Sequence, residues 1–419
     1  MDQHTSGHPN SSGPLSSGLS EEALKKSMKA PQARKSSALT KPGVLATAAP
    51  SDAFTFSLKP KQVAKHLDRF VIGQKEAKKV LGVALCDHFQ HVRMTLDGHA
   101  APFYQKQNIL LLGPTGVGKT HLIRSAAELI GVPFVKADAT KFSETGYVGG
   151  DVDDLVRDLV RKAGGDASKA SHGVIYLDEA DKLATRGNSN GRDVSGRGVQ
   201  TNLLKLMEDG DVPLVSQNDV NGQIQSAVAA MRGGGSSAPE TINTRHILFI
   251  VSGAFSGLDQ IIRQRLLASD PPVPVKRLSV DQLLAQASTQ DLIQYGLEPE
   301  FIGRLPVRVA CHSLDTTDLF EVLRRSESSL IHQYERAFEA YGIEAKFHDD
   351  GLRRLAEMAY SERTGARGLM TVCERVFRDL KFALPSSSVR AIDITARLVD
   401  DPKLELKRLL KKTKAAKPF

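Results

Sequence analysis

Two short segments of this sequence combine the residue types that bind polyphosphates and activate water. Residues 113–120 read Gly-Pro-Thr-Gly-Val-Gly-Lys-Thr and follow the apolar run 109–112. Asp178 and Glu179 end a second apolar run, residues 173–177. Glycines let a backbone curl around phosphate oxygens, a lysine offsets their charge, and carboxylates hold a metal ion or a water molecule. The two segments therefore predict a site for a nucleoside triphosphate.

The loop at 113–120 stands in the strand–loop–helix context of a P-loop. The run before it has the length of a buried strand, and apolar residues recur at helical spacing after it. This context disfavours the alternative, a glycine turn that only resembles the motif. The residues expected to bind the nucleotide here are Gly113, Pro114, Thr115, Gly116, Val117, Gly118, Lys119 and Thr120. We expect Lys119 to reach the β- and γ-phosphates and the Thr120 hydroxyl to ligate Mg²⁺.

The positions of the two acids predict different chemical roles for them. Asp178 is expected to hold Mg²⁺ through its water shell at the carboxyl end of a strand beside the P-loop. Glu179 is expected to orient and deprotonate the attacking water. The alternative, that both acids merely cap a helix, is disfavoured by the apolar run before them and the P-loop upstream. Glu179 favours hydrolysis of ATP over mere sensing of the nucleotide.

The composition narrows the class of protein. The chain has 419 residues, of which 41% are hydrophobic and 25% charged, so it can bury a large core. Its three cysteines, Cys86, Cys311 and Cys373, lack C-x-x-C spacing, which disfavours a disulfide framework or a zinc module. No apolar run approaches the length of a membrane span. We expect a cytoplasmic protein without zinc and without a membrane partner.

Alternating strand and helix patterns predict an α/β fold with an open, mostly parallel sheet between helices. Beyond the sheet the apolar pattern is mainly helical. The expected parts are a disordered N-terminal arm (1–55), a large P-loop ATPase domain (56–308), a smaller, mostly α-helical domain (309–402) and a basic tail (403–419).

Three further positions each allow two interpretations from the residues alone. Val71 and Ile72 lie on a bend between two helical patterns and either cover an adenine ring or form a packing corner. Tyr147 and Val148 stand between glycines and either grip an apolar ligand or belong to a simple turn. Ser252 ends a strand and either senses the γ-phosphate or starts a turn.

Taken together, the motifs resemble the AAA+ ATPases of the ClpX/HslU unfoldase family over roughly residues 58–400. The shared segments are L-D-R-F-V-I-G-Q, the P-loop, E-T-G-Y-V-G, Y-L-D-E-A-D-K, I-L-F-I-V-S-G-A-F-S-G-L-D, E-F-I-G-R-L-P-V and T-G-A-R-G-L. The resemblance implies a P-loop AAA+ domain with a small lid domain, and a ring homo-hexamer with ATP and Mg²⁺ at its subunit interfaces. It also implies that unfolded or tagged protein substrates are threaded through a central pore.

The resemblance assigns roles that spacing alone does not. Arg304, in F-I-G-R, looks like the arginine finger inserted into the neighbouring subunit's site. Arg367, in G-A-R-G-L, looks like the arginine by which the small domain senses the γ-phosphate. Val71 and Ile72 match the adenine-contact box of the family. Tyr147 matches, with Val148, the pore loop that grips polypeptide.

The sequence departs from the family in places that concern its partners. The paired cysteines of the N-terminal zinc module are not found, and neither is the Ile-Gly-Phe tripeptide that docks a Clp-type peptidase. Arg197 stands where the family usually has Glu. The expected function is therefore ATP-driven protein unfolding, with or without a peptidase partner. The alternative is a nucleic-acid motor or loader, suggested by the pI of about 9.2 and the basic tail. The aromatic-aliphatic pore loop disfavours it, because phosphate tracking calls for Lys or Arg.

Overall fold

The computed structural model divides into two units, residues 1–53 and 54–419. The residues that it describes are 54–99, 104–143, 151–184, 194–214, 241–269, 275–327 and 329–415, all in the second unit. The expected arm at 1–55 therefore falls almost entirely outside the described residues. The expected pore-loop residues Tyr147 and Val148 lie outside them as well.

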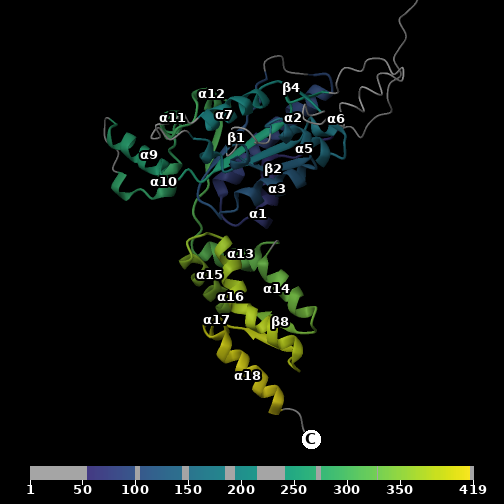
Figure 1. Ribbon diagram of the computed structural model, residues 1–419, viewed down its shortest axis with the longest axis vertical. Helices are drawn as coiled ribbons and strands as arrows, with labels where there is room; N and C mark the ends of the chain where they lie inside the picture. The colour runs from purple at the N-terminus through teal and green to yellow at the C-terminus, as the bar shows by residue number, and fades with distance from the viewer. Residues whose placement is uncertain are drawn as a thin grey trace, which may run out of the picture. The chain divides into compact units, whose positions relative to one another are not determined.

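The centre of the large part is a five-stranded sheet in which all neighbouring strands run parallel. Its order is β2-β3-β6-β1-β7, so β1 lies between two strands that come much later in the chain. Figure 1 labels β1 and β2 of this sheet, with helices around them. The bounds are β1 (Ile109–Leu112), β2 (Phe134–Asp138), β3 (Val174–Asp178), β6 (Leu248–Gly253) and β7 (Val307–Ala310). The mostly parallel sheet predicted from the sequence is confirmed.

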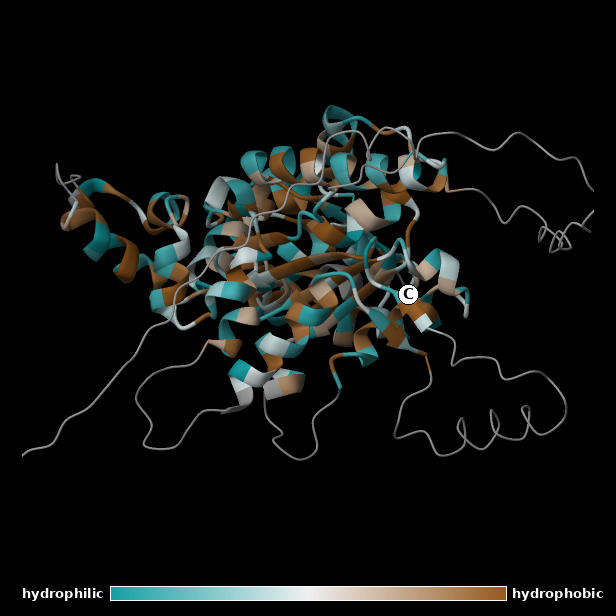
Figure 2. Ribbon diagram, turned by 90° about the horizontal axis from the view of Figure 1, so that it is seen from above, coloured by the Kyte–Doolittle hydropathy of each residue, from teal (hydrophilic) through white to brown (hydrophobic). Residues whose placement is uncertain are grey.

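Helices cover both faces of this sheet. Successive residues of a strand point to opposite faces, so the strand side chains alternate between two buried clusters. Leu111 and Tyr176 face one cluster, while Leu110 and Leu177 face the other. The first cluster includes α1 (Pro60–Phe70), α2 (Lys75–Leu96) and α3 (Lys119–Ile130). The second includes α5 (Asp154–Lys162), α6 (Ala167–Ala170), α7 (Val194–Met207), α9 (Leu258–Leu267), α10 (Val280–Leu284), α11 (Thr289–Tyr295) and α12 (Pro299–Gly303). Figure 2 shows brown, apolar strands between helices whose outer faces are teal.

Short elements complete the large part. They are α4 (Thr140–Ser143), the 3-10 helices η1 (Ala180–Leu183) and η2 (Val275–Arg277), and the antiparallel pair β4 (Asp211–Pro213) and β5 (Thr241–Asn243). No helix among the described residues is long and apolar enough to cross a bilayer.

The chain after β7 is mainly helical, as the sequence predicts. Its elements are α13 (Thr316–Arg325), α14 (Leu330–Glu339), β8 (Glu344–Phe347), α15 (Asp349–Ser361), α16 (Arg367–Ala383), η3 (Leu384–Ser386), β9 (Ala391–Ile394), α17 (Ala396–Asp400) and α18 (Pro402–Ala415). The segment described from sequence as a basic tail is mostly the helix α18. Three leucines of α18, Leu406, Leu409 and Leu410, pack against the first buried cluster. The helix therefore has an apolar side, which the many lysines of the segment made hard to recognise in the sequence.

Two side-chain contacts join the turn between α1 and α2 to the later part of the chain. The Gln74 amide donates to the His312 carbonyl at 2.8 Å and accepts from the His312 backbone N–H at 2.9 Å. Ser326 donates to the carbonyl of Phe70 at 2.9 Å. Gln74 is almost fully buried and has a left-handed backbone with φ of 53°. The turn that carries Val71 and Ile72 is thereby fixed beside the segment that leads from β7 into α13.

Candidate nucleotide-binding site

The loop between β1 and α3 curls tightly because three of its glycines adopt positive φ angles. These are 141° at Gly113, 76° at Gly116 and 95° at Gly118. A Cβ on Gly113 would lie 2.4 Å from the carbonyl oxygen of Cys311, and one on Gly116 would lie 2.1 Å from that of Thr364. Both glycines are therefore required by close approach as well as by conformation.

Lys119 is the first residue of α3 and is only 8% exposed. Its Nζ donates to the carbonyls of Gly113 and Pro114 at 2.6 and 2.8 Å. Burial lowers the pKa of this ammonium, and the nearby Asp178 partly opposes that shift. The charged group is thus held inside the curl of the loop, beside the N-terminus of the helix.

Asp178 stands at the end of β3, and both of its carboxylate oxygens are engaged. Oδ2 accepts from the Thr120 hydroxyl at 3.2 Å and lies 2.9 Å from Nζ of Lys136. Oδ1 accepts from the Ser252 hydroxyl at 2.7 Å and from the Glu179 backbone N–H at 3.1 Å. Burial alone would raise the pKa of Asp178, but the hydrogen bonds from Ser252 and Lys136 outweigh it and lower the pKa below its usual value. The carboxylate is therefore ionised near neutral pH.

Lys136 was not among the residues singled out from the sequence, because F-V-K-A reads as a strand with one polar position. Its approach to Asp178 comes from the pairing of β2 with β3, which sets Lys136 opposite Tyr176 and Asp138 opposite Asp178. Ser252 had been left with two interpretations. It is fully buried and lies between the Tyr176 hydroxyl, at 2.7 Å, and Asp178, so it contacts the site through the Asp178 carboxylate and not from the wall of the cavity.

Glu179 departs from ordinary backbone geometry. Its φ is 58°, in the left-handed region that side chains other than glycine avoid, at a cost of about 1 kcal/mol or more. The residue lines a cavity of about 490 Å³. The residues lining it are Thr115, Gly116, Gly118, Lys119, Thr120, His121, Asp178, Glu179, Asp181, Lys182, Ala254, Ala366, Arg367 and Met370. The strained backbone thus belongs to the residue that the sequence assigns to water activation.

Arg367 enters the same cavity from the first turn of α16. The preceding residue, Ala366, donates its backbone N–H to the carbonyl of Gly116 at 2.8 Å. The turn T-G-A-R therefore rests directly on the P-loop. The sequence predicted this position for Arg367 only through family resemblance, and the structure brings it onto the wall of the cavity that holds Lys119.

A second cavity, of about 250 Å³, adjoins the first and is more apolar in its walls. Val71 and Ile72 line it, together with Val117, Leu314 and Leu369. The two cavities share Gly118, His121, Ala366 and Met370. Polar walls beside an apolar slot are the arrangement that a nucleotide needs for its phosphates and its base.

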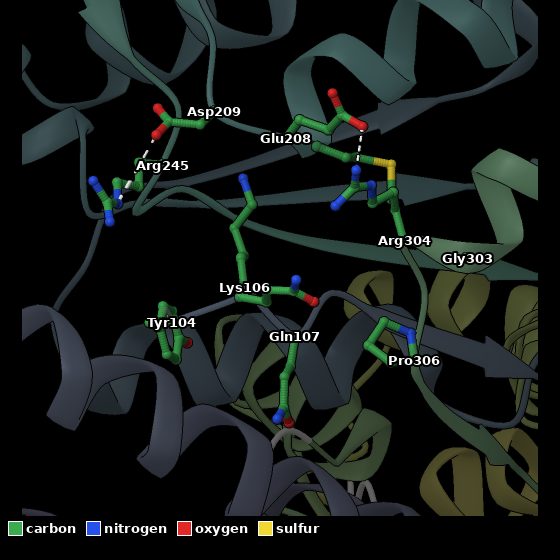
Figure 3. Close-up of a pocket in the computed structure, with 11 residues that line it drawn as sticks. Tyr104, Lys106, Gln107, Glu208, Asp209, Arg245, Gly303, Arg304 and Pro306 are labelled. Carbon is green, nitrogen blue, oxygen red and sulfur yellow. Dashed lines mark ion pairs between the residues drawn. The ribbon is translucent and has the colours of Figure 1, made fainter. Parts of the chain in front are cut away.

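Arg304 lies at a different place, on a cavity of about 490 Å³ lined by the segment before β1 and by the ends of α7 and α12 with the residues that follow them (Figure 3). Its guanidinium forms an ion pair with Glu208 at 2.6 Å. Arg245 and Asp209, 3.9 Å apart, form the second ion pair on this cavity, and the Lys106 side chain extends between the two pairs in Figure 3. Arg304 therefore does not join Lys119 and Glu179 within its own chain. The charge reversal at Arg197 is accommodated locally, since Arg197 lies 3.2 Å from Glu298.

Comparison with known proteins agrees with this geometry. The model of the AAA domain (Cdc48 subfamily) matches residues 104–308, which include the P-loop and both acids. The ATP-dependent Clp protease ATP-binding subunit ClpX of Borrelia duttonii is 40% identical over 333 residues, covering 78% of this chain and 75% of the relative. The corresponding subunit ClpX 3 of Methylococcus capsulatus is 38% identical over 359 residues, covering 82% of this chain and 80% of the relative.

The family predicted by the sequence motifs is thereby confirmed, as is the activity class, an ATP-binding ATPase. With 40% identity over three quarters of a relative's length, and with its P-loop and paired acids on one cavity, the chain belongs to the ClpX-like AAA+ ATPases.

Proposed function

We propose that this ATPase hydrolyses Mg²⁺-bound ATP in the cavity between the P-loop, the end of β3 and the start of α16. Lys119 binds the β- and γ-phosphates, and Arg367 contacts the γ-phosphate from the small domain. Glu179 takes the proton of the attacking water. The observation that carries this assignment is the presence of Lys119, Glu179 and Arg367 on the wall of one cavity, although Lys119 and Arg367 are 248 positions apart in the sequence.

The residues at the end of β3 fit a magnesium ion. The Thr120 hydroxyl and the Asp178 carboxylate lie 3.2 Å apart, and both offer the hard oxygen ligands that Mg²⁺ prefers. The lowered pKa of Asp178 keeps that carboxylate in the ionised form that a cation requires. When bound, the ion offsets the charge that develops on the phosphates. Thr120 and Asp178 would hold it, and Ser252 fixes the orientation of the carboxylate.

The base of the nucleotide occupies the adjoining apolar cavity. Val71 and Ile72 form one wall, and Leu369 of α16 another. Because the later helical part supplies residues to both cavities, loss of the γ-phosphate changes what Arg367 and its helix contact. That change is the source of the domain movement in this proposal.

Arg304 completes the site of a neighbouring subunit in a homo-hexameric ring. Its position on a separate cavity supports a role between subunits rather than within one. Its guanidinium would exchange the carboxylate of Glu208 for the γ-phosphate of the neighbour's ATP. A positioned arginine of this kind raises phosphoryl-transfer rates by about 10³–10⁵-fold.

The work done by hydrolysis is the unfolding of protein in the cytoplasm. Tyr147 and Val148, on the pore loop, grip unfolded or tagged polypeptide and draw it through the ring. The two relatives are ATP-binding subunits of a Clp protease, which makes a Clp-type peptidase the first partner to test.

A fluorescent protein with a degradation tag tests this proposal directly. The purified chain is mixed with ATP and the tagged protein, with and without a Clp-type peptidase. We expect ATP-dependent loss of fluorescence without the peptidase, and disappearance of the polypeptide only with it. Tyr147→Ala should keep hydrolysis and lose unfolding. Hydrolysis stimulated by DNA, with unchanged fluorescence, would instead support the nucleic-acid motor.

A further inference from the structure

A lysine ammonium lies between the two oxygens that we assign to the metal ion. Nζ of Lys136 is 2.9 Å from Oδ2 of Asp178 and 3.3 Å from Oγ1 of Thr120. These two oxygens are themselves 3.2 Å apart. Three atoms in so small a triangle place a positive charge where a P-loop protein otherwise holds its metal ion.

The position of Lys136 on β2 is unusual for a lysine. Strand residues two apart share a face, so Lys136 lies on the same face as Phe134, and its partner on β3 is Tyr176. Tyr176 belongs to the first buried cluster, and Phe134 packs against it. The ammonium nitrogen lies 5.8 Å from the centre of the Tyr176 ring and 2.9 Å from the Asp178 carboxylate. The stem therefore runs beside apolar side chains, and the charge reaches Asp178 and Thr120, two residues that line the nucleotide cavity.

We propose that Lys136 is a tethered cation of the nucleotide site, which lets this protein bind nucleotide phosphates without a divalent metal ion. In the nucleotide-free protein it neutralises Asp178. When a nucleotide binds, the ammonium turns to a phosphate oxygen, because it has three N–H donors and can keep one existing contact while it donates to another oxygen. The inference rests on the proposed site at Lys119, Thr120 and Asp178.

The same geometry makes Lys136 a competitor of Mg²⁺. Magnesium requires oxygen ligands at about 2.0–2.1 Å in near-octahedral arrangement, so it cannot use Thr120 and Asp178 while the ammonium lies between them. Removal of the charge should therefore act in two opposite directions. Binding of metal-free nucleotide should weaken, and the gain in affinity that Mg²⁺ brings should grow.

The experiment measures the dissociation constants of ADP and of a non-hydrolysable ATP analogue by calorimetry. Each is determined once in excess Mg²⁺ and once in EDTA, on the full chain. The quantity of interest is the ratio of the constant in EDTA to the constant in Mg²⁺. Lys136→Met and Lys136→Gln should raise this ratio about tenfold or more, the value of one charge-assisted hydrogen bond. Lys136→Arg should stay close to the wild-type ratio.

Two controls separate this inference from the site on which it depends. Lys162→Met removes an exposed lysine at the end of α5 and should leave the ratio unchanged. Lys119→Ala should abolish binding under both conditions. Suppose that Lys119→Ala loses binding as expected, while both neutral Lys136 variants keep the wild-type ratio. That result would overturn the tethered cation and leave the nucleotide site standing. Undiminished binding by Lys119→Ala would contradict the nucleotide site itself.

Discussion

At the scale of residues, the two neighbouring acids Asp178 and Glu179 differ in the side chains that each contacts. Both oxygens of Asp178 are engaged with Thr120, Lys136 and Ser252, and its pKa is lowered. A carboxylate in that state is a weak base and a good holder of cations. Glu179 instead lies on the wall of the cavity, on a strained backbone. These differences fit Glu179 as the general base.

Glu179→Gln should therefore separate binding from hydrolysis. The amide keeps the size of the side chain but cannot accept the proton of water, so the rate of hydrolysis should fall by about 10²-fold or more. Affinity for ATP should stay within a few-fold of wild type. Steady-state hydrolysis and binding of a fluorescent nucleotide measure the two quantities. Hydrolysis within twofold of wild type would remove Glu179 from the role of base.

The sequence predicted the residues of the site that stand next to one another in a motif. The P-loop and the pair Asp178 and Glu179 could be found because a few contiguous residues carry the chemistry. Lys136 could not, because its role depends on the register between β2 and β3, which no local pattern specifies. Arg367 required the family, since its approach to the P-loop is set by packing between distant segments.

At the scale of elements, the contact between the P-loop and the turn before α16 joins the two parts of the nucleotide site. Gly116 accepts a hydrogen bond from the Ala366 N–H and lies directly against Thr364. There is no room at this contact for a side chain on the glycine. The position of Arg367 over the phosphate cavity therefore depends on a backbone-to-backbone approach.

Gly116→Ala should disrupt nucleotide binding by separating these elements. The new Cβ would stand 2.1 Å from the Thr364 carbonyl oxygen, so either the loop or the start of α16 must move. We expect affinity for ATP to fall by about tenfold or more, equivalent to about 1.4 kcal/mol.

A matched control exists at the other end of α3. Gly131 has a similar φ of 79°, but a Cβ there meets nothing within 4 Å. Gly131→Ala should cost roughly 1 kcal/mol of stability from backbone strain and leave nucleotide affinity unchanged. Equal loss of affinity in both variants would attribute the effect to strain in general and not to this contact.

Helix α2 is joined to the sheet by a buried histidine whose neutral form is required. Nε2 of His88 donates to the His246 carbonyl at 3.0 Å, so Nδ1 is left to accept from the Tyr104 hydroxyl at 3.3 Å. Burial lowers the pKa of His88 to about 3, from an ordinary value of 6.5. The folded protein therefore keeps this side chain uncharged at pH values where the unfolded chain binds a proton.

Stability should accordingly fall as the pH is lowered below about 6.5. The contribution of His88 is complete above that value and decreases by up to about 1.4 kcal/mol per pH unit until its folded pKa is reached. Urea midpoints measured between pH 7.5 and 5 should show this decrease. His88→Gln, which cannot titrate, should flatten the dependence, whereas the exposed His332→Gln should not. An identical slope in wild type and His88→Gln would contradict the assignment.

At the scale of the whole molecule, the order of strands and helices followed from the sequence, because each element carries its own apolar period. The parallel sheet and the mainly helical later part were predicted in this way and are confirmed. The helix α18 was missed because lysines dominate its sequence. Its leucines can be assigned to packing only when the buried cluster that they contact is known.

The central claim is that each active site is shared, with Glu179 from one subunit and Arg304 from its neighbour. Arg304→Ala and Glu179→Gln should each lower the rate of hydrolysis by about 10²-fold or more on their own. When the two inactive variants are mixed in equal amounts and allowed to exchange subunits, roughly a quarter of the interfaces in a ring should be competent. Mixing either variant with the double variant Glu179→Gln/Arg304→Ala provides the control, because no interface is then complete. We predict that ATP hydrolysis recovers toward a quarter of the wild-type rate in the mixture of Arg304→Ala with Glu179→Gln, and not in the mixtures with the double variant. A mixture that exchanges subunits and stays as inactive as its components would contradict the shared site.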